Sequence, residues 1–227
     1  MSLELALRLT ELLLAAALLQ RNIEHIAAPR GDRVLFFANA MASLWLMTGL
    51  WDAFALLVLC ALSLAQLHRF GGAYNGGSDK MSFLVLYCVT LAHWLPDGVG
   101  QELAFGYLGL QLILSYLISG QVKITNPLWR SGQALQEVFS YSAYPVSQNL
   151  RDLATKPRLL WTASWAVIVF EVAFPLAILH PFALYIALGI AAMFHLANAV
   201  LFGLNRFVWA WIAAYPSVIW LQDRLIG

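Results

Sequence analysis

Residues 182–203 read FALYIALGIAAMFHLANAVLFG, and this stretch indicates the fold class. It contains no Asp, Glu, Lys or Arg, and a helix needs about 20 apolar residues to cross the hydrocarbon core of a bilayer. The rest of the chain has the same character, because 61% of its 227 residues are hydrophobic and 11% are charged. Soluble domains carry about 25% charged residues. The sequence therefore predicts an integral membrane protein.

Seven further apolar runs accompany this one. All eight lie at residues 5–20, 34–50, 53–67, 81–95, 103–120, 159–179, 182–203 and 207–221. We expect an all-α integral membrane protein, a single bundle of about eight transmembrane helices forming one domain over residues 1–227, with no soluble domain. The first run carries Arg8 and Glu11 one turn apart. It is either an interfacial helix or a span whose polar face turns inward.

The basic residues segregate strongly when the eight runs are treated as alternating spans. Eleven fall on one side, namely Arg21, Arg30, Arg33, Arg69, Lys80, Lys123, Arg130, Arg151, Lys156, Arg158 and Arg206. Only Arg8 and Arg224 fall on the other side, where the connections carry Asp52, Asp97, Glu102 and His180. By the positive-inside rule, the basic side faces the cytoplasm. The formal net charge of +1 gives no reason to expect nucleic acid as a partner.

The one long connection spans residues 121–158. Long structureless loops in compact proteins are uncommon unless they have a function. Its sequence predicts a turn that contains Pro127, Trp129 and Arg130, an amphipathic helix from about Gly132 to Tyr141, and a second short helix near Val146 to Ala154. We expect both short helices to lie at the membrane interface.

Three polar side chains lie deep in the apolar runs or at their ends. Glu171 and His195 are candidates for function because burial of ionisable groups in a membrane is costly. Counting along each helix puts Glu171 about 18 Å and His195 about 12 Å from the basic side, with Lys123 near zero. These residues, with Asn198 one turn from His195, are expected to line one polar cleft. The alternative is a Glu171–His195 hydrogen bond that only joins two helices.

Lys123 admits two interpretations from the residues alone. A lysine in water keeps its proton at pH 7, so a catalytic base at this position would need desolvation or a neighbouring cation. The other interpretation is a snorkelling lysine at a helix C-terminus that pairs with lipid phosphate. Cys60 and Cys88 lie singly in apolar runs without metal-binding spacing, so we expect no metal.

Four segments carry a resemblance to a known family. They are SYLISGQVKITNPLWRSGQAL (115–135), NGGSDKMSFLVLY (75–87), FEVAFPLAIL (170–179) and MFHLANAVLFGLNRFVWAWIAAYPSVIW (193–220). Their order and spacing resemble the horizontally transferred transmembrane (HTTM) family and the membrane domain of vitamin K-dependent gamma-carboxylase. In that family, a pattern Y-x-x-(A/S)-G-x-x-K followed by Trp and then Gly carries the lysine that acts as base. Lys123 matches that lysine.

The resemblance implies a particular chemistry. The lysine deprotonates a reduced quinone of the vitamin K or menaquinol type, the anion reacts with dioxygen, and the resulting strong base takes a carbon-bound proton before carbon dioxide adds. It implies catalytic roles for Lys123, His195 and Glu171, and quinone contacts for Asn198 and Trp129. The carboxylase's soluble portion, which holds its polypeptide substrate, has no counterpart here, so the resemblance does not extend to glutamate carboxylation itself. Bacterial relatives implicated in peptide-toxin maturation imply a peptide substrate, a partner protein and a multi-pass location in the bacterial cytoplasmic (inner) membrane.

Two function classes therefore remain open. One is a membrane oxidoreductase or lyase acting on a lipid quinol and dioxygen. The other is a non-catalytic membrane partner that anchors or presents a peptide or a partner enzyme. The face that holds Lys123 is also open, because the eukaryotic carboxylase acts in the lumen whereas the charge distribution places Lys123 on the cytoplasmic side.

Overall fold

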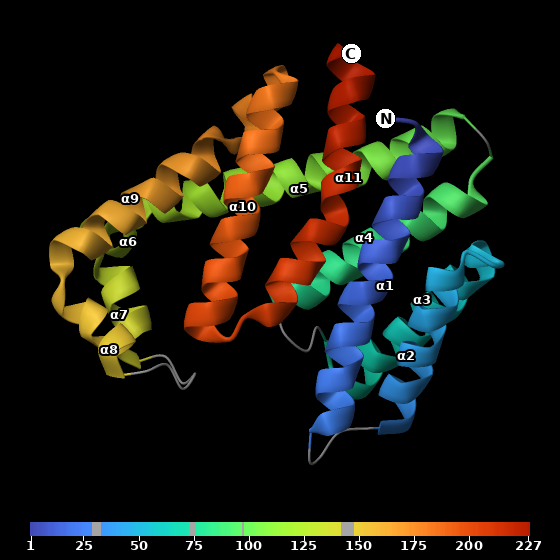
Figure 1. Cartoon of the computed structure of the whole chain (residues 1–227), viewed down its shortest axis with the longest axis horizontal. Helices are drawn as coiled ribbons and strands as arrows, with labels where there is room; N and C mark the ends of the chain where they lie inside the picture. Colours follow the sequence, from blue (N-terminus) through green and yellow to red (C-terminus); the bar gives the residue numbers. More distant parts are fainter. Residues whose placement is uncertain (29–32, 73–75, 97, 142–147) are drawn as a thin grey trace. The chain divides into compact units, whose positions relative to one another are not determined.

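The computed structural model describes residues 1–28, 33–72, 76–96, 98–141 and 148–227, and these residues form helices and no strand. The helices are α1 (Leu3–Ala27), α2 (Arg33–Thr48), α3 (Asp52–Phe70), α4 (Gly77–Trp94), α5 (Val99–Thr125), α6 (Pro127–Ser131), α7 (Gln133–Tyr141), α8 (Gln148–Arg151), η1 (Asp152–Thr155), α9 (Pro157–Ala173), η2 (Phe174–Leu179), α10 (Pro181–Phe202) and α11 (Asn205–Ile226) (Figure 1). The predicted all-α fold is confirmed.

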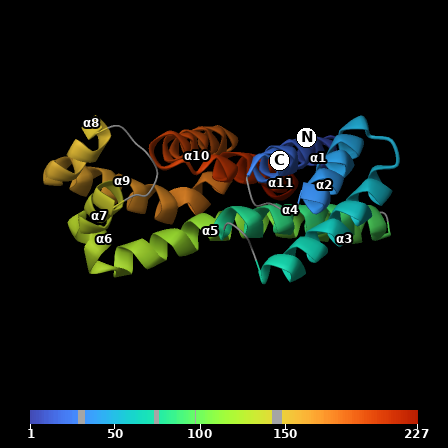
Figure 2. The ribbon, with the colours of Figure 1, turned by 90° about the horizontal axis from the view of Figure 1, so that it is seen from below.

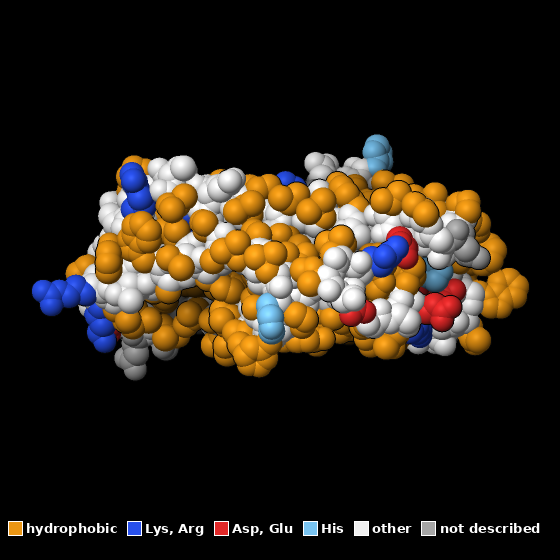
Figure 3. Space-filling model, turned by 90° about the horizontal axis from the view of Figure 1, so that it is seen from above, with side chains coloured by type: hydrophobic (Ala, Val, Ile, Leu, Met, Phe, Trp, Pro, Cys, Tyr) orange, Lys and Arg blue, Asp and Glu red, His pale blue; other side chains and the backbone are white. Residues whose placement is uncertain are grey.

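Each of the eight apolar runs corresponds to one long helix. Four helical segments among the described residues are long and apolar enough to cross a membrane: Asp52–Phe70, Val99–Thr125, Pro157–Leu179 and Pro181–Phe202. On the face drawn in Figure 3, hydrophobic side chains cover most of the surface and charged ones are sparse. These helices indicate an integral membrane protein, whereas the count of about eight spans stays a prediction. Arg30 and Asp97, used in the charge distribution, lie outside the described residues.

The chain forms two compact units, one of Met1–Leu110 with Arg206–Gly227 and the other of Gln111–Asn205. In the first unit, α1 contacts α2 and α4, and α3 also contacts α2 and α4, which closes a four-helix arrangement (Figures 1 and 2). Its interior is filled by fully buried side chains including Leu14, Leu46, Leu59 and Leu86. The prediction of a single domain remains a prediction.

Helix α1 turns its polar face into this unit. Its buried residues include Thr10, Glu11, Arg21, Asn22 and His25. Asn22 donates a hydrogen bond to Asn39 of α2 (2.8 Å), and Arg21 donates one to Gln66 of α3 (2.8 Å). The polar face of α1 therefore points into the protein, while both interpretations of the first run, interfacial helix or span, stay predictions. Polar groups on a membrane helix find hydrogen-bond partners when they are buried against other helices of the protein.

His25, beyond the apolar run 5–20, has an unusual electrostatic environment. Burial, reinforced by the positive charges of Arg206 and Arg21, lowers the pKa of its imidazole from 6.5 to about 4. Its ring stacks on Phe36 with 4.1 Å between ring centroids. His25 is therefore a neutral side chain at pH 7.

In the second unit, the 121–158 connection folds back along α9. The predicted helix from Gly132 to Tyr141 is confirmed as α7, whereas the predicted turn around Trp129 is the short helix α6. Of the predicted second helix, Val146 and Ser147 lie outside the described residues, and the described part forms α8 and η1. Both α6 and α7 contact α9, and Figures 1 and 2 show them beside its N-terminal part.

Specific contacts fix α6 against α9. The Ser164 hydroxyl donates to the Trp129 carbonyl (2.5 Å), and the Trp165 indole donates to the Arg130 carbonyl (3.1 Å). Gly132 ends α6 at φ +81°, and a Cβ there would lie 2.8 Å from the Trp161 backbone nitrogen. Only glycine fits such a position without strain. The connection is therefore a packed part of the unit.

Candidate functional site

Lys123 and Glu171 form an ion pair between α5 and α9. The Lys123 ammonium donates to both oxygens of the Glu171 carboxylate, at 2.8 Å to Oε1 and 2.7 Å to Oε2. The Lys123 side chain is 16% exposed and that of Glu171 is 4% exposed. The pair is thus largely removed from water, and both predicted residues belong to one site.

Gly120 allows the two helices to approach closely enough for this pair. It lies nearly one helical turn before Lys123, and a Cβ at this position would lie 2.8 Å from the backbone nitrogen of Val172. That distance is far below van der Waals contact, so no larger residue fits without a shift. This close approach of α5 and α9 thus falls beside Glu171.

The predicted depth difference between Lys123 and Glu171 is wrong. Counting residues along the helix from Leu159 predicted that Glu171 lies about 18 Å deeper in the membrane than Lys123. In the structure their charged groups are in contact. Two features explain the error. Helix α5 continues to Thr125, and α6 and α7 lie beside the first turns of α9. The end of α5 is therefore level with the last turn of α9.

Trp129 completes the environment of the ammonium. Lys123 Nζ lies 5.1 Å from the centroid of the Trp129 ring, within the range of a cation–π interaction. Asn126 caps α6 by accepting a hydrogen bond from the Leu128 backbone nitrogen, so the chain turns directly after Lys123 and returns Trp129 to it. The structure thus brings Lys123, Glu171 and Trp129 together.

His195 belongs to a second pair in the same unit. Its Nε2 lies 3.0 Å from the Tyr116 hydroxyl, and the two side chains are buried. Phe174 packs on the Tyr116 ring with 4.2 Å between centroids. The described hydrogen bonds thus join Glu171 to Lys123 and His195 to Tyr116, in place of the Glu171–His195 bond weighed from the sequence.

Asn198 forms a hydrogen bond within its own helix. Its side-chain nitrogen donates to the Phe194 carbonyl of its own helix at 3.0 Å, and it is half-buried. A cavity of about 800 Å³ is lined by residues of α5 and α11 such as Leu103, Tyr107 and Trp220, and by neither Lys123 nor His195. The residues predicted to line one cleft include members of two side-chain pairs, Lys123–Glu171 and Tyr116–His195. Each pair has one residue on α5.

Tyr116 and Gly120 are the site residues that the sequence interpretation did not select. Tyr116 precedes Lys123 by seven residues, or about two helical turns, so both side chains project from the same face of α5. Gly120 lies between them on that face. Both belong to the quoted Y-x-x-S-G-x-x-K pattern, and the periodicity of a helix was the signal that would have identified them.

The fold and this site define a helical membrane protein with a buried lysine–glutamate pair between two of its long helices. The family model described as the HTTM domain matches residues 103–221, which is more than half of the chain. The chain belongs to the HTTM domain family. This domain is found in vitamin K-dependent carboxylase-like proteins. No curated protein and no solved structure matches the chain.

The structure shows what the residues of the pattern around Lys123 contact. Tyr116 pairs with His195, Gly120 admits α9, Lys123 binds Glu171, Trp129 covers the ammonium, and Gly132 packs α6 on Trp161. Five positions of the pattern therefore have a separate contact within the second unit.

Proposed function

We propose that this protein is a membrane enzyme in which Lys123 is the base that deprotonates a reduced quinone of the vitamin K or menaquinol type for reaction with dioxygen. The observation that carries the proposal is the Lys123–Glu171 pair, in which the amine has a proton acceptor at 2.7 Å. Membership of the HTTM family supports it.

The pair resolves the main difficulty of a lysine base. A lysine ammonium must lose a proton before it can accept one. The proposed mechanism therefore begins with transfer of a proton from Nζ to Glu171 Oε2, which lies 2.7 Å away. The Lys123 amine then accepts the proton of a hydroxyl group. At the end Lys123 is an ammonium, Glu171 is a neutral acid, and the substrate anion is balanced by the ammonium.

Two features of the site support the proposal of a reduced quinone. The Lys123 side chain is more exposed than Glu171, so its amine is the member of the pair that a hydroxyl reaches. Trp129 offers an aromatic surface at the amine, suited to a flat ring. Asn198 and His195 are proposed further contacts. Bound there, the quinone would supply the anion that reacts with dioxygen, and carbon dioxide would be a further reactant if the chemistry continues to carboxylation.

The wider role follows the same proposal. We place the protein in the bacterial cytoplasmic membrane as a multi-pass protein with about eight spans, acting in the modification or maturation of a peptide. The alternative is a non-catalytic partner that presents a peptide or a partner enzyme. That alternative has its own support, because an ion pair that joins α5 to α9 also stabilises the unit without any chemistry.

Quinol-dependent oxygen uptake separates these functions. The purified protein is supplied with reduced menaquinone or vitamin K, and Lys123→Ala is compared with Lys156→Ala, an exposed lysine at the start of α9. We expect uptake by the wild type and by Lys156→Ala, and loss of uptake in folded Lys123→Ala. If no preparation takes up oxygen and an organic extract of the protein contains no quinone, the partner role is supported instead.

A further inference from the structure

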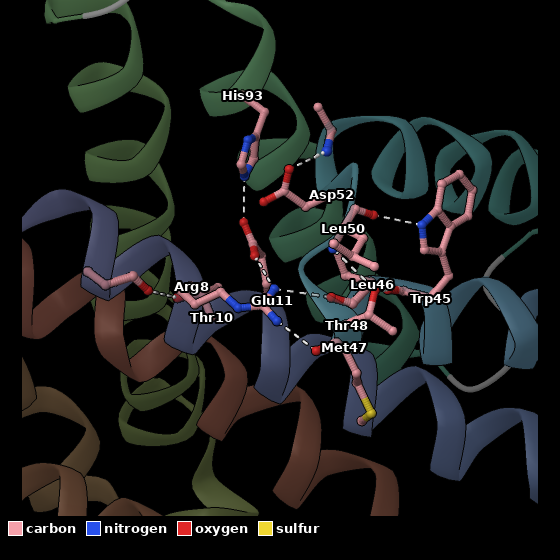
Figure 4. A network of polar contacts seen from close by, with 12 residues as sticks. Arg8, Thr10, Glu11, Trp45, Leu46, Met47, Thr48, Leu50, Asp52 and His93 are labelled. Carbon is pink, nitrogen blue, oxygen red and sulfur yellow. Dashed lines mark hydrogen bonds and ion pairs between the residues drawn. The ribbon is translucent and has the colours of Figure 1, made fainter.

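Three side chains distant in sequence meet in the first unit. They are Glu11 of α1, Asp52 at the start of α3 and His93 in the last turn of α4. One potential metal-ligand atom from each lies within 4.8 Å of the other two (Figure 4). This cluster, outside the matched residues 103–221, takes no part in the proposed quinone chemistry.

Glu11 is held firmly in this cluster. It is 1% exposed, and its Oε1 lies 2.5 Å from His93 Nε2. Its other oxygen accepts a hydrogen bond from Arg8 at 2.8 Å. Arg8 is itself fixed, because it donates to the backbone carbonyls of Leu46 and Met47 at the end of α2 (Figure 4). One carboxylate oxygen is therefore bound to Arg8 while the other faces His93.

Asp52 is oriented by its own helix. Its Oδ1 accepts a hydrogen bond from the Ala53 backbone nitrogen at 2.9 Å, which places the carboxylate at the first turn of α3. In Figure 4 the carboxylate of Asp52 lies beside the imidazole of His93 and the carboxylate of Glu11. The three ligand groups come from three different helices whose packing fixes their approach.

We propose that Glu11, Asp52 and His93 bind one divalent transition-metal ion. A neutral imidazole and two carboxylates form a nitrogen and oxygen donor set suited to Zn²⁺, Mn²⁺ or Fe²⁺, whereas Mg²⁺ and Ca²⁺ favour oxygen donors alone. With Arg8, the two carboxylates leave one net negative charge, which a divalent ion would compensate. Three protein ligands leave at least one coordination position for water or a substrate.

The geometry requires only a small adjustment to admit an ion. Zinc lies about 2.0 to 2.2 Å from nitrogen and oxygen ligands, so two ligands of a tetrahedral site are roughly 3.3 Å apart. The Glu11–His93 contact of 2.5 Å must therefore open by less than about 1 Å. This opening would come from rotation of the Glu11 and His93 side chains, with Arg8 as a partner of the second oxygen of Glu11.

Metal content of the full-length protein in detergent tests this site. The protein is stripped with a chelator, reloaded with Zn²⁺ or Co²⁺, desalted and analysed by elemental analysis, and the Co²⁺ form by visible absorption. We expect about one ion per chain in the wild type and at least about a 10-fold weaker affinity in His93→Gln and Asp52→Asn. Asp52→Asn retains an oxygen for the Ala53 backbone nitrogen, so it preserves the start of α3.

Exposed histidines provide the matched controls. His68→Gln and His180→Gln lie outside the cluster and are expected to retain wild-type metal content. A stripped and reloaded wild type that holds no ion would contradict the proposal, and so would equal metal content in wild type, His93→Gln and Asp52→Asn. In that case the cluster is a hydrogen-bonded contact among α1, α3 and α4. Neither result depends on quinone-dependent activity.

Discussion

At the scale of single residues, the central feature is a charged pair in a place that disfavours charge. Burial of either ion alone is expensive, and their mutual attraction offsets that cost only while both are present. Glu171 was selected because an ionisable residue stands out in an apolar run, whereas Lys123 and Trp129 were selected through the family resemblance. Sequence reasoning did not give their pairing, since nothing in the one-dimensional pattern reports which faces of two apolar helices meet.

The pair makes a stability prediction. Lys123→Met or Glu171→Leu alone leaves one buried charge without its partner and should destabilise the protein by about 3 to 5 kcal/mol. The double variant removes both charges and should recover most of that loss. Unfolding of the wild type, both single variants and the double variant in one detergent measures the coupling. Additive losses in the double variant would show that the pair contributes no coupling.

At the scale of elements, the apolar runs predicted the long helices well because run length is the dominant signal in a membrane chain. The position of α6 and α7 along α9 could not be predicted, because amphipathicity indicates an interface and does not say which helix supplies it. The same limit hid the convergence of α1, α3 and α4 on Glu11, whose partners are far away in the sequence.

Gly120 tests the close approach of α5 and α9. Gly120→Ala places a Cβ 2.8 Å from the Val172 backbone nitrogen, so the helices must separate and the Lys123–Glu171 contact must lengthen. We expect a loss of about 1 to 3 kcal/mol in stability and a drop in any activity that depends on Lys123. Gly189→Ala in α10 is the control, because a Cβ there meets no atom within 4 Å. Equal behaviour of the two variants would rule out a special role for Gly120.

The inward polar face of α1 predicts a pH dependence through His25. Its folded-state pKa of about 4 lies below the unfolded value near 6.5, so the unfolded chain binds more protons between these pH values. Stability should therefore fall as the pH drops from about 6.5 towards 4, by roughly 1 to 2 kcal/mol at pH 5. Melting temperatures of wild type and His25→Gln across this range provide the comparison. The variant should show the shallower decline, and parallel curves would mean that His25 does not contribute.

At the scale of the whole molecule, the composition alone indicated an all-helical membrane protein, and the family match to residues 103–221 agrees with the resemblance drawn from the sequence. Within the part of the chain that the structure describes, four helical segments are long and apolar enough to cross a membrane. A shorter or more polar helix would need the membrane interface or protein partners to cross it. Charge segregation remains the best guide to how the chain is oriented.

Orientation can be tested by labelling single cysteines. With Cys60 and Cys88 replaced, a cysteine at Gln136 in α7 should be protected from an impermeant thiol reagent in intact cells, and one at His180 should react. The reason is that the 121–158 connection carries basic residues whereas His180 lies on the sparsely charged side. Reaction of both positions from outside would contradict the assigned orientation.

The central claim is that Lys123 accepts a proton from a reduced quinone, and Lys123→Arg tests it most directly. Arginine keeps a positive charge beside Glu171 and Trp129, so the ion pair and the cation–π contact are retained, but its guanidinium does not release its proton at accessible pH. Quinol-dependent oxygen uptake is measured for the folded wild-type and Lys123→Arg proteins at equal concentration. The account predicts uptake by the wild type and at least about a 100-fold lower rate in the variant. Wild-type uptake by Lys123→Arg would contradict it and leave Lys123 as a structural member of the pair.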